Sequence, residues 1–336
     1  MGSLGRLSST APWIPAGLAL AAALAGSALV GPAGLSPGQV WHGLWHPSSI
    51  DGVILWRLRM PRELTAAAVG SALSLAGTVL QGVFHNPLAD PYIVGAASGA
   101  AFGATLSLLV APAAVAAFVL PVGAFLGALG AVAVALGVAA RTLGRSTVTL
   151  LLVGYAVSVV LGAAISLLLL LDRQNLETIF FWELGSVATA TWAGLVPALP
   201  LIALAAVVPF AYRWELDALL LGEADAASLG VDVARVRLLL LASASLLTAA
   251  AVALAGIIGF VGLVAPHAVR RLVGAGHRRL VPAASLAGAA FLVAADTAAR
   301  SIPVLGEVPI GVVTALTGGP LFVYLLVTRP VAAGRS

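Results

Sequence analysis

Long stretches without a charged side chain run through this sequence, and they limit the environments in which the chain can fold. A charged residue at the centre of a membrane-spanning helix costs about 2.5–3.5 kcal/mol, and a span needs about 20 residues. Only 9% of the residues are charged, whereas soluble domains carry about a quarter. The sequence therefore predicts an all-α, polytopic membrane protein. Eight long runs contain no Asp, Glu or Arg: 7–50, 64–89, 91–140, 146–171, 184–212, 238–269, 280–295 and 308–328.

Two of these runs are long enough for two helices each, so we expect ten spans in a single transmembrane domain covering 1–336. A turn at Ala111-Pro112 divides one run, and a break between Gly256 and Gly262 divides another. The first apolar stretch resembles a signal peptide, but it is long and more spans follow, so we expect a retained helix. The predicted helices lie near 12–31, 62–83, 93–110, 115–140, 147–171, 191–210, 236–256, 258–270, 281–300 and 309–327.

The arginines are distributed unevenly between the two sides of such a topology. With the N-terminus in the cytoplasm, twelve arginines lie inside and five outside, which is the positive-inside bias of a cell-membrane protein. Ten crossings then place both termini and the segment 211–235 in the cytoplasm. All seven tryptophans fall in loops or at predicted helix ends, where aromatic belts form at membrane interfaces.

The side chains that drive catalysis or ion coupling in membranes are scarce. The chain has no lysine and no cysteine, which excludes a P-loop lysine, a Schiff base and a thiolate site. Asp296 is the clearest ionisable residue within a span, and Arg300 is expected to pair with it. An ion-coupled carrier is the weaker alternative, and no HExxH or GxSxG motif supports a hydrolase. The chain is not expected to be an enzyme or to hold a cofactor or metal, so energy for uphill transport must come from another protein.

A short helix is predicted inside the cytoplasmic segment 211–235. Gly230 suits the left-handed position that follows a helix, and Asp232 suits the N-cap of the next span. Small and acidic residues here can form a compact knob that fits a partner's cleft, although a solvated connector explains them equally well. The residues of this candidate contact are Gly222, Glu223, Ala224, Asp225, Ala226, Ala227, Ser228, Leu229, Gly230 and Asp232.

Three arginines on the expected outer face run against the charge bias. Arg59 and Arg62 precede and open the second span, and Arg300 closes the ninth. Arginine is well suited to bidentate pairing with carboxylates. The cluster can therefore receive an acidic protein or an anionic solute, and contact with lipid headgroups is the alternative.

Histidines and turn residues elsewhere favour structural roles. His42 and His46 have the spacing of a helical metal pair, but no third ligand is near and Pro47 follows, so we expect an interfacial loop within 32–50. His267 is expected to bond to backbone. The stretch from Asn86 to Pro91 is typical of a turn-rich loop.

Short stretches spread along nearly the whole chain form a recognisable series. They are Arg59-Met60-Pro61-Arg62, Gln81-Gly82, Asn86 to Pro91, Gly95 to Gly99, Phe181-Trp182, Leu184-Gly185-Ser186, Gly222 to Val231, Gly259 to Leu263, Pro266-His267, Asp296 with Arg300, and Glu307 to Gly311. In the order and spacing of these stretches, the sequence resembles the permease subunits of type II ABC importers, which take up iron-siderophores, haem and cobalamin.

The resemblance implies a homodimer with two cytoplasmic ATPase subunits and one extracytoplasmic substrate-binding protein. It implies that Arg59, Arg62 and Arg300 pair with glutamates of the binding protein, and that 222–230, continuing to Asp232, sits in the ATPase cleft. An iron chelate, siderophore or haem, is the expected solute, with cobalamin as the alternative. The resemblance does not identify the residues that line the pathway.

Overall fold

The chain folds into a bundle of helices of very different lengths. The structure, a computed structural model, describes residues 13–31, 34–141, 147–171, 173–301 and 307–328, and every regular element within these ranges is helical. The α-helices are α1 (Ile14–Leu29), α2 (Pro37–Trp45), α3 (Ile50–Val53), α4 (Met60–Val83), α5 (Ala96–Val110), α6 (Ala116–Arg141), α7 (Thr147–Leu171), α8 (Leu176–Glu183), α9 (Trp192–Ala211), α10 (Arg213–Leu219), α11 (Glu223–Ser228), α12 (Val233–Ala255), α13 (Val261–Val273), α14 (His277–Ala299) and α15 (Ile310–Thr328). A π-helical turn, Ile54–Arg59, joins α3 to α4.

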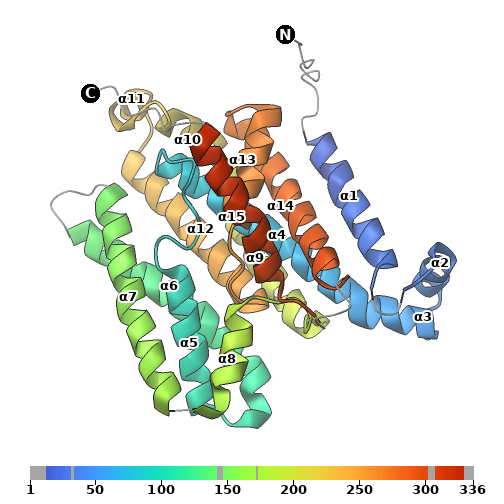
Figure 1. Cartoon of the computed structure of the whole chain (residues 1–336). Helices are drawn as coiled ribbons and strands as arrows, with labels where there is room; N and C mark the ends of the chain where they lie inside the picture. Colours follow the sequence, from blue (N-terminus) through green and yellow to red (C-terminus); the bar gives the residue numbers. More distant parts are fainter. Residues whose placement is uncertain (1–12, 32–33, 142–146, 172, 302–306, 329–336) are drawn as a thin grey trace.

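α4 is the central helix of the bundle. It packs against α9, α12, α13 and α14, and most of its side chains are buried (Figure 1). The hairpin of α5 and α6, with α7 beside it, covers one flank through α12, and α1 covers the other through α14. The short helices α10 and α11 lie at one end of the bundle, and α2 and α3 lie toward the opposite end.

Small residues bring the central helices into direct backbone contact. A Cβ atom at Gly77 of α4 would lie 1.9 Å from the carbonyl oxygen of Gly262 in α13. Between α4 and α14, a Cβ atom at Gly70 would lie 2.2 Å from the carbonyl oxygen of Gly288. In lipid, helix association depends on such close approach, because burial of apolar surface gives little gain there.

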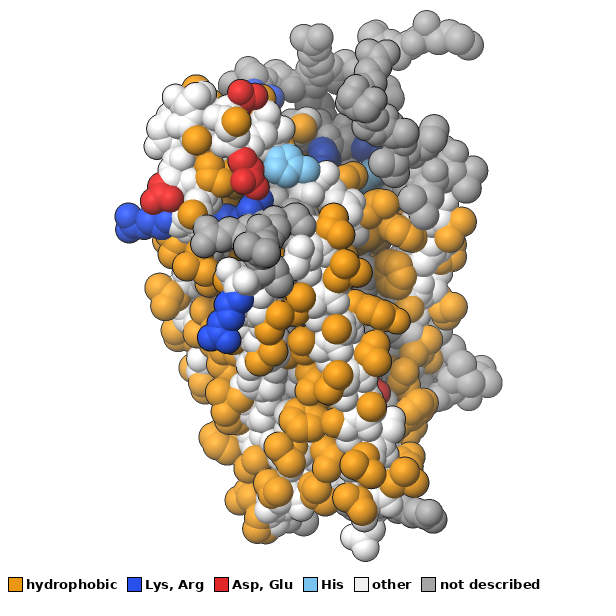
Figure 2. All heavy atoms as spheres, turned by 90° about the vertical axis from the view of Figure 1, so that its left-hand side faces the viewer, with side chains coloured by type: hydrophobic (Ala, Val, Ile, Leu, Met, Phe, Trp, Pro, Cys, Tyr) orange, Lys and Arg blue, Asp and Glu red, His pale blue; other side chains and the backbone are white. Residues whose placement is uncertain are grey.

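The outer surface of the bundle is apolar. Figure 2 shows hydrophobic side chains over most of one lateral face, with charged side chains gathered near one end. Within the described residues, six helical segments are long and apolar enough to cross a membrane, and three shorter apolar helices lie in α1, α5 and α15. The exposed apolar side chains of α6, α7 and α9 belong to this surface.

Each of the ten predicted ranges overlaps a helix, but several ends differ. The second span was expected to begin near residue 62, whereas helical backbone continues without interruption from Ile50 to Val83. The predicted start was placed after Asp51, Arg57 and Arg59, because charged residues mark the end of a membrane span. They do not end a helix, whose hydrogen bonds are local.

The helices α5 and α13 begin a few residues later than expected. Gly95 and Phe260, the residues immediately before them, have left-handed backbone with φ of 89° and 68°. A residue in this conformation interrupts the helical hydrogen-bond pattern, so the helix can start only after it.

The prediction of a loop at His42 and His46 is wrong, because α2 occupies Pro37–Trp45 within the stretch 32–50. Ser36 and Gln39 form a reciprocal capping box, and Pro37 occupies the first turn, where its missing N–H costs nothing. His42 lies inside α2, its ring stacks on that of His46, and its Nδ1 lies 3.4 Å from Asp51.

Candidate functional site

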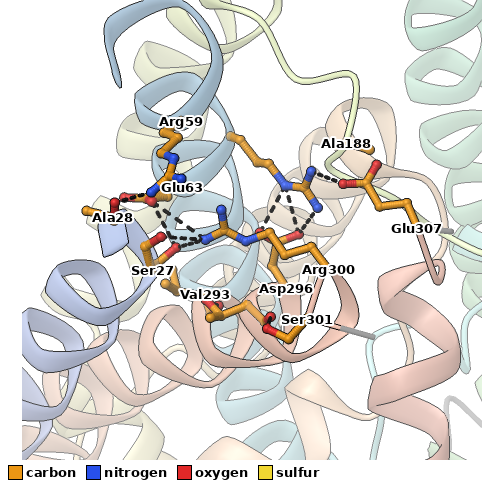
Figure 3. Close-up of polar contacts among 12 residues, drawn as sticks. Ser27, Ala28, Arg59, Glu63, Ala188, Val293, Asp296, Arg300, Ser301 and Glu307 are labelled. Carbon is orange, nitrogen blue, oxygen red and sulfur yellow. Dashed lines mark hydrogen bonds and ion pairs between the residues drawn. The ribbon is translucent and has the colours of Figure 1, made fainter. Parts of the chain in front are cut away.

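Charged side chains from three helices meet at the C-terminal end of α14 (Figure 3). Arg62, in the first turn of α4, donates from Nε to both carboxylate oxygens of Asp296 at 3.1 and 3.0 Å, and from Nη2 to Oδ1 at 2.7 Å. The side chain of Asp296 is only 2% exposed. Arg62 also forms an ion pair with Glu307, which precedes α15.

Arg300 extends this group toward α1. Its guanidinium donates to the carbonyl oxygen of Ser27 at 2.8 Å and lies 3.5 Å from Asp296 and 3.7 Å from Glu63. The Ser27 hydroxyl donates to Glu63 at 2.9 Å. Arg59 donates to the carbonyl oxygen of Ala28 at the end of α1. These contacts tie α1, α4 and α14 together.

We call this group the arginine cluster. It comprises Ser27, Arg59, Arg62, Glu63, Asp296, Arg300 and Glu307. The structure brings together the three arginines predicted from sequence, and the expected pair of Asp296 and Arg300 is present. Arg59 and Arg300 are nevertheless buried, and three carboxylates of the same chain balance the three arginines.

Sequence reasoning missed Ser27 and Glu63 and treated Glu307 only as part of a longer motif. Glu63 carried a usable signal, because a carboxylate at the start of an apolar span needs a cationic partner. Ser27 carried none, since it lies within an apolar helix and meets Glu63 only through the packing of α1 on the bundle.

The predicted contact segment lies at the opposite end of the bundle. The expected helix is α11, Glu223–Ser228, followed by Gly230 with a left-handed φ of 87°. Asp232 caps α12 by accepting from the backbone N–H of Arg235 at 3.1 Å. Ser228 and Leu229 are exposed, whereas Ala226 is fully buried beneath them.

α10 attaches this segment to the core through contacts that sequence reasoning did not anticipate. Leu216 and Leu219 are buried. Asp217 contacts His277, the first residue of α14, and His85 Nε2 contacts the carbonyl oxygen of Leu219. The partners lie 60 and 134 residues apart in sequence, so no local pattern links them.

The turn-rich loop after α4 is confirmed. Asn86 accepts from the N–H of Leu88, and Asp90 accepts from the N–H of Tyr92, both at 3.0 Å. The Tyr92 hydroxyl lies 3.3 and 3.2 Å from the backbone oxygen and nitrogen of Ile258. The loop is thereby joined to the break between α12 and α13.

The apolar helical bundle with its two polar ends is that of a multi-pass membrane protein. The chain belongs to the FecCD transport family, whose model matches residues 19–328. Members of this family are the membrane permease components of ABC importers, which are not themselves catalytic.

Two relatives and one solved structure show the extent of the similarity. The chain is 47% identical to the cobalamin import system permease protein of Halobacterium salinarum, with 84% of this chain and 75% of the relative covered. It is 39% identical to the hemin transport system permease protein of Yersinia pestis, with 90% of this chain and 91% of the relative covered. The solved structure is an inward-facing conformation of a metal-chelate type ABC transporter, with 35% identity, a TM-score of 0.83, and 94% and 99% covered.

Proposed function

We propose that this permease forms the translocation path of an ATP-driven importer of a metal chelate, working as a homodimer. Two cytoplasmic ATPase subunits supply the energy, and a substrate-binding protein delivers the solute from outside. The observation that carries this proposal is family membership combined with two polar regions at opposite ends of one apolar bundle. In this proposal the exposed α11 segment contacts the ATPase, and the arginine cluster receives an acidic partner.

The first candidate for the solute is an iron chelate, either a siderophore or haem. Cobalamin is the second candidate, and the 47% identical relative named for cobalamin import favours it. Both are bulky metal complexes, so the same apolar bundle can serve either one. Binding of each compound to the cognate binding protein separates the two candidates.

The decisive test is uptake by the permease reconstituted in lipid vesicles with its ATPase and binding protein. Radiolabelled haem and cobalamin serve as probes in parallel vesicles. We expect one of them to accumulate only when ATP, the ATPase and the binding protein are all present. Accumulation by the permease alone under an ion gradient would replace this proposal with an ion-coupled carrier.

The arginine cluster suggests how docking is controlled. Acidic groups of a binding protein must compete with the carboxylates that already face the arginines. Glu307 is the weakest competitor, because its side chain is 41% exposed and it belongs to no helix. We propose that glutamates of the binding protein displace Glu307 from Arg62.

Replacing Glu307 by glutamine should therefore tighten docking. Without the competing carboxylate, the Kd for the binding protein should fall roughly three- to tenfold at low salt and rise again with salt. Surface plasmon resonance on nanodisc-embedded permease measures this change. Glu177→Gln is the matched control, because it removes one exposed acid on the same expected side outside the cluster. Weaker docking of the Glu307 variant would contradict displacement.

The proposed orientation places α11 in the cytoplasm and the loop before α8 outside. The chain contains no cysteine, so single cysteines at Ser228 and Gln174, both exposed, report on opposite faces. In intact cells, a membrane-impermeant maleimide should label the cysteine at 174 and leave that at 228 unlabelled until the membrane is opened. Labelling of both from outside would overturn the topology.

A further inference from the structure

The N-terminus of α14 is capped by a residue from another helix. Asp217 of α10 accepts from the backbone N–H of His277 at 2.9 Å and contacts His277 Nδ1 at 2.7 Å. A carboxylate can only accept, so Nδ1 carries the proton in this contact. The N-cap residue of α14 is Gly276, which has no side chain to satisfy the first N–H groups. Asp217 takes this role and places its negative charge at the positive end of the helix dipole.

At this contact, α10 and α14 also pack tightly against the last turns of α4. The His277 side chain is only 1% exposed, and its Nε2 has no hydrogen-bond partner within the described residues. A Cβ atom at Gly82 of α4 would lie 3.0 Å from a methyl carbon of Leu216 and 3.1 Å from His277 Nε2. The His277 ring and the Leu216 side chain therefore both contact the last turns of α4. α10 and the start of α14 are therefore in contact with each other and with the same turn of α4.

The other end of α14 carries the arginine cluster. Asp296 lies four residues before Arg300, the C-cap residue of the helix, and both join the ion pairs with α4. The 23 residues of α14 extend about 34 Å at 1.5 Å per residue. One continuous helix, with Pro282 in its second turn, thus links the segment that contains α11 to the cluster proposed to receive the binding protein.

We propose that Asp217 and His277 form a clasp that transmits movement of the α10–α11 segment through α14 to the arginine cluster. This inference rests on the proposed function and names the joint through which its two ends communicate. In this proposal both are positioning residues, because they act on the placement of α14. Nucleotide bound to the ATPase then changes the affinity for the binding protein, and the binding protein changes nucleotide affinity by the same factor.

The test measures binding-protein affinity with and without ATP and vanadate, using the permease–ATPase complex in nanodiscs. For the wild type we expect nucleotide to change Kd by ~10-fold. In Asp217→Ala this change should shrink to within ~2-fold while ATPase association persists, because the coupling free energy is lost. Ser243→Ala is the matched control, since it removes a buried 2.7 Å bond between α12 and α9 that does not involve α14. It should respond like the wild type.

Three further variants separate transmission from simple misfolding. His277→Asn retains an N–H donor near the Nδ1 position, whereas His277→Gln places its amide nearer Nε2, so the asparagine variant should keep more of the nucleotide response. The chain contains no cysteine, so a double variant with Asp217→Cys and His277→Cys can form one disulfide at this position. The reduced double variant should lose the nucleotide response of binding-protein affinity, and the oxidised one should recover it.

Each outcome has a distinct meaning. An unchanged nucleotide response in Asp217→Ala, or no recovery once gel mobility shows the disulfide, would overturn the clasp. If wild-type affinity for the binding protein did not depend on nucleotide while ATP-driven uptake persisted, the clasp proposal would be contradicted. The proposal that the protein is part of an ATP-driven importer would be kept. Absence of ATP-driven uptake in the wild type would remove the importer proposal itself.

Discussion

Replacing Arg62 by leucine should destabilise the permease by about 3–5 kcal/mol, the cost of leaving a buried charge without its partner. Asp296 is nearly inaccessible to water and receives three hydrogen bonds from Arg62. Arg300, at 3.5 Å, is the only other cation that contacts it among the described residues. Thermal unfolding in detergent, followed by tryptophan fluorescence, measures the loss.

The matched control is Arg57→Leu. Arg57 is an exposed arginine one helical turn and a half before Arg62, and its replacement should cost no more than about 1 kcal/mol. The double variant Arg62→Leu with Asp296→Leu should be more stable than Arg62→Leu alone, because the buried carboxylate that has lost its main partner is gone. Equal stability of Arg62→Leu and Arg57→Leu would show that the ion pair does not stabilise the fold.

Adding a single methyl group at Gly77 should disrupt the packing of α4 on α13. The new Cβ atom in Gly77→Ala would lie 1.9 Å from a backbone oxygen, and a backbone atom in a packed helix cannot move aside cheaply. The helices must separate, which costs about 3 kcal/mol or more. Loss of the monodisperse peak in size-exclusion chromatography and a lower midpoint of thermal unfolding are the expected results.

Gly130→Ala tests whether this effect comes from contact or from glycine itself. Gly130 lies in the middle of α6, and beyond the backbone of its own helical turns no heavy atom of the described residues lies within 4 Å of the position of a Cβ. The alanine there should be neutral or stabilise the helix by about 0.5–1 kcal/mol. Similar losses in both variants would mean that the Gly77 contact is not tight.

Features that depend on neighbouring residues could be predicted well. The charge-free runs located the helices, Gly230 marked the end of α11, and Asp232 marked the start of α12. The start of the second span and the α2 helix were missed. Charges were treated there as helix ends, and a loop-like composition concealed a capping box.

Contacts between distant residues could not be predicted in this way. The three arginines were singled out from sequence, but their burial and their pairing with Glu63, Asp296 and Glu307 were not expected as a group. Arg62 and Asp296 are 234 residues apart. Their meeting depends on the way α4 packs against α14.

The amino-acid sequence alone indicated that the chain is helical and lies in a membrane, and the resemblance along nearly its whole length placed it among transporter permeases. Hydropathy and capping are local properties, and each can be recognised in a short stretch of sequence. Only the tertiary structure decided that Asp217 caps α14 and that the arginine cluster is internally neutralised. Those facts depend on the close approach of helices through small residues, and hydropathy alone does not specify which apolar faces will meet.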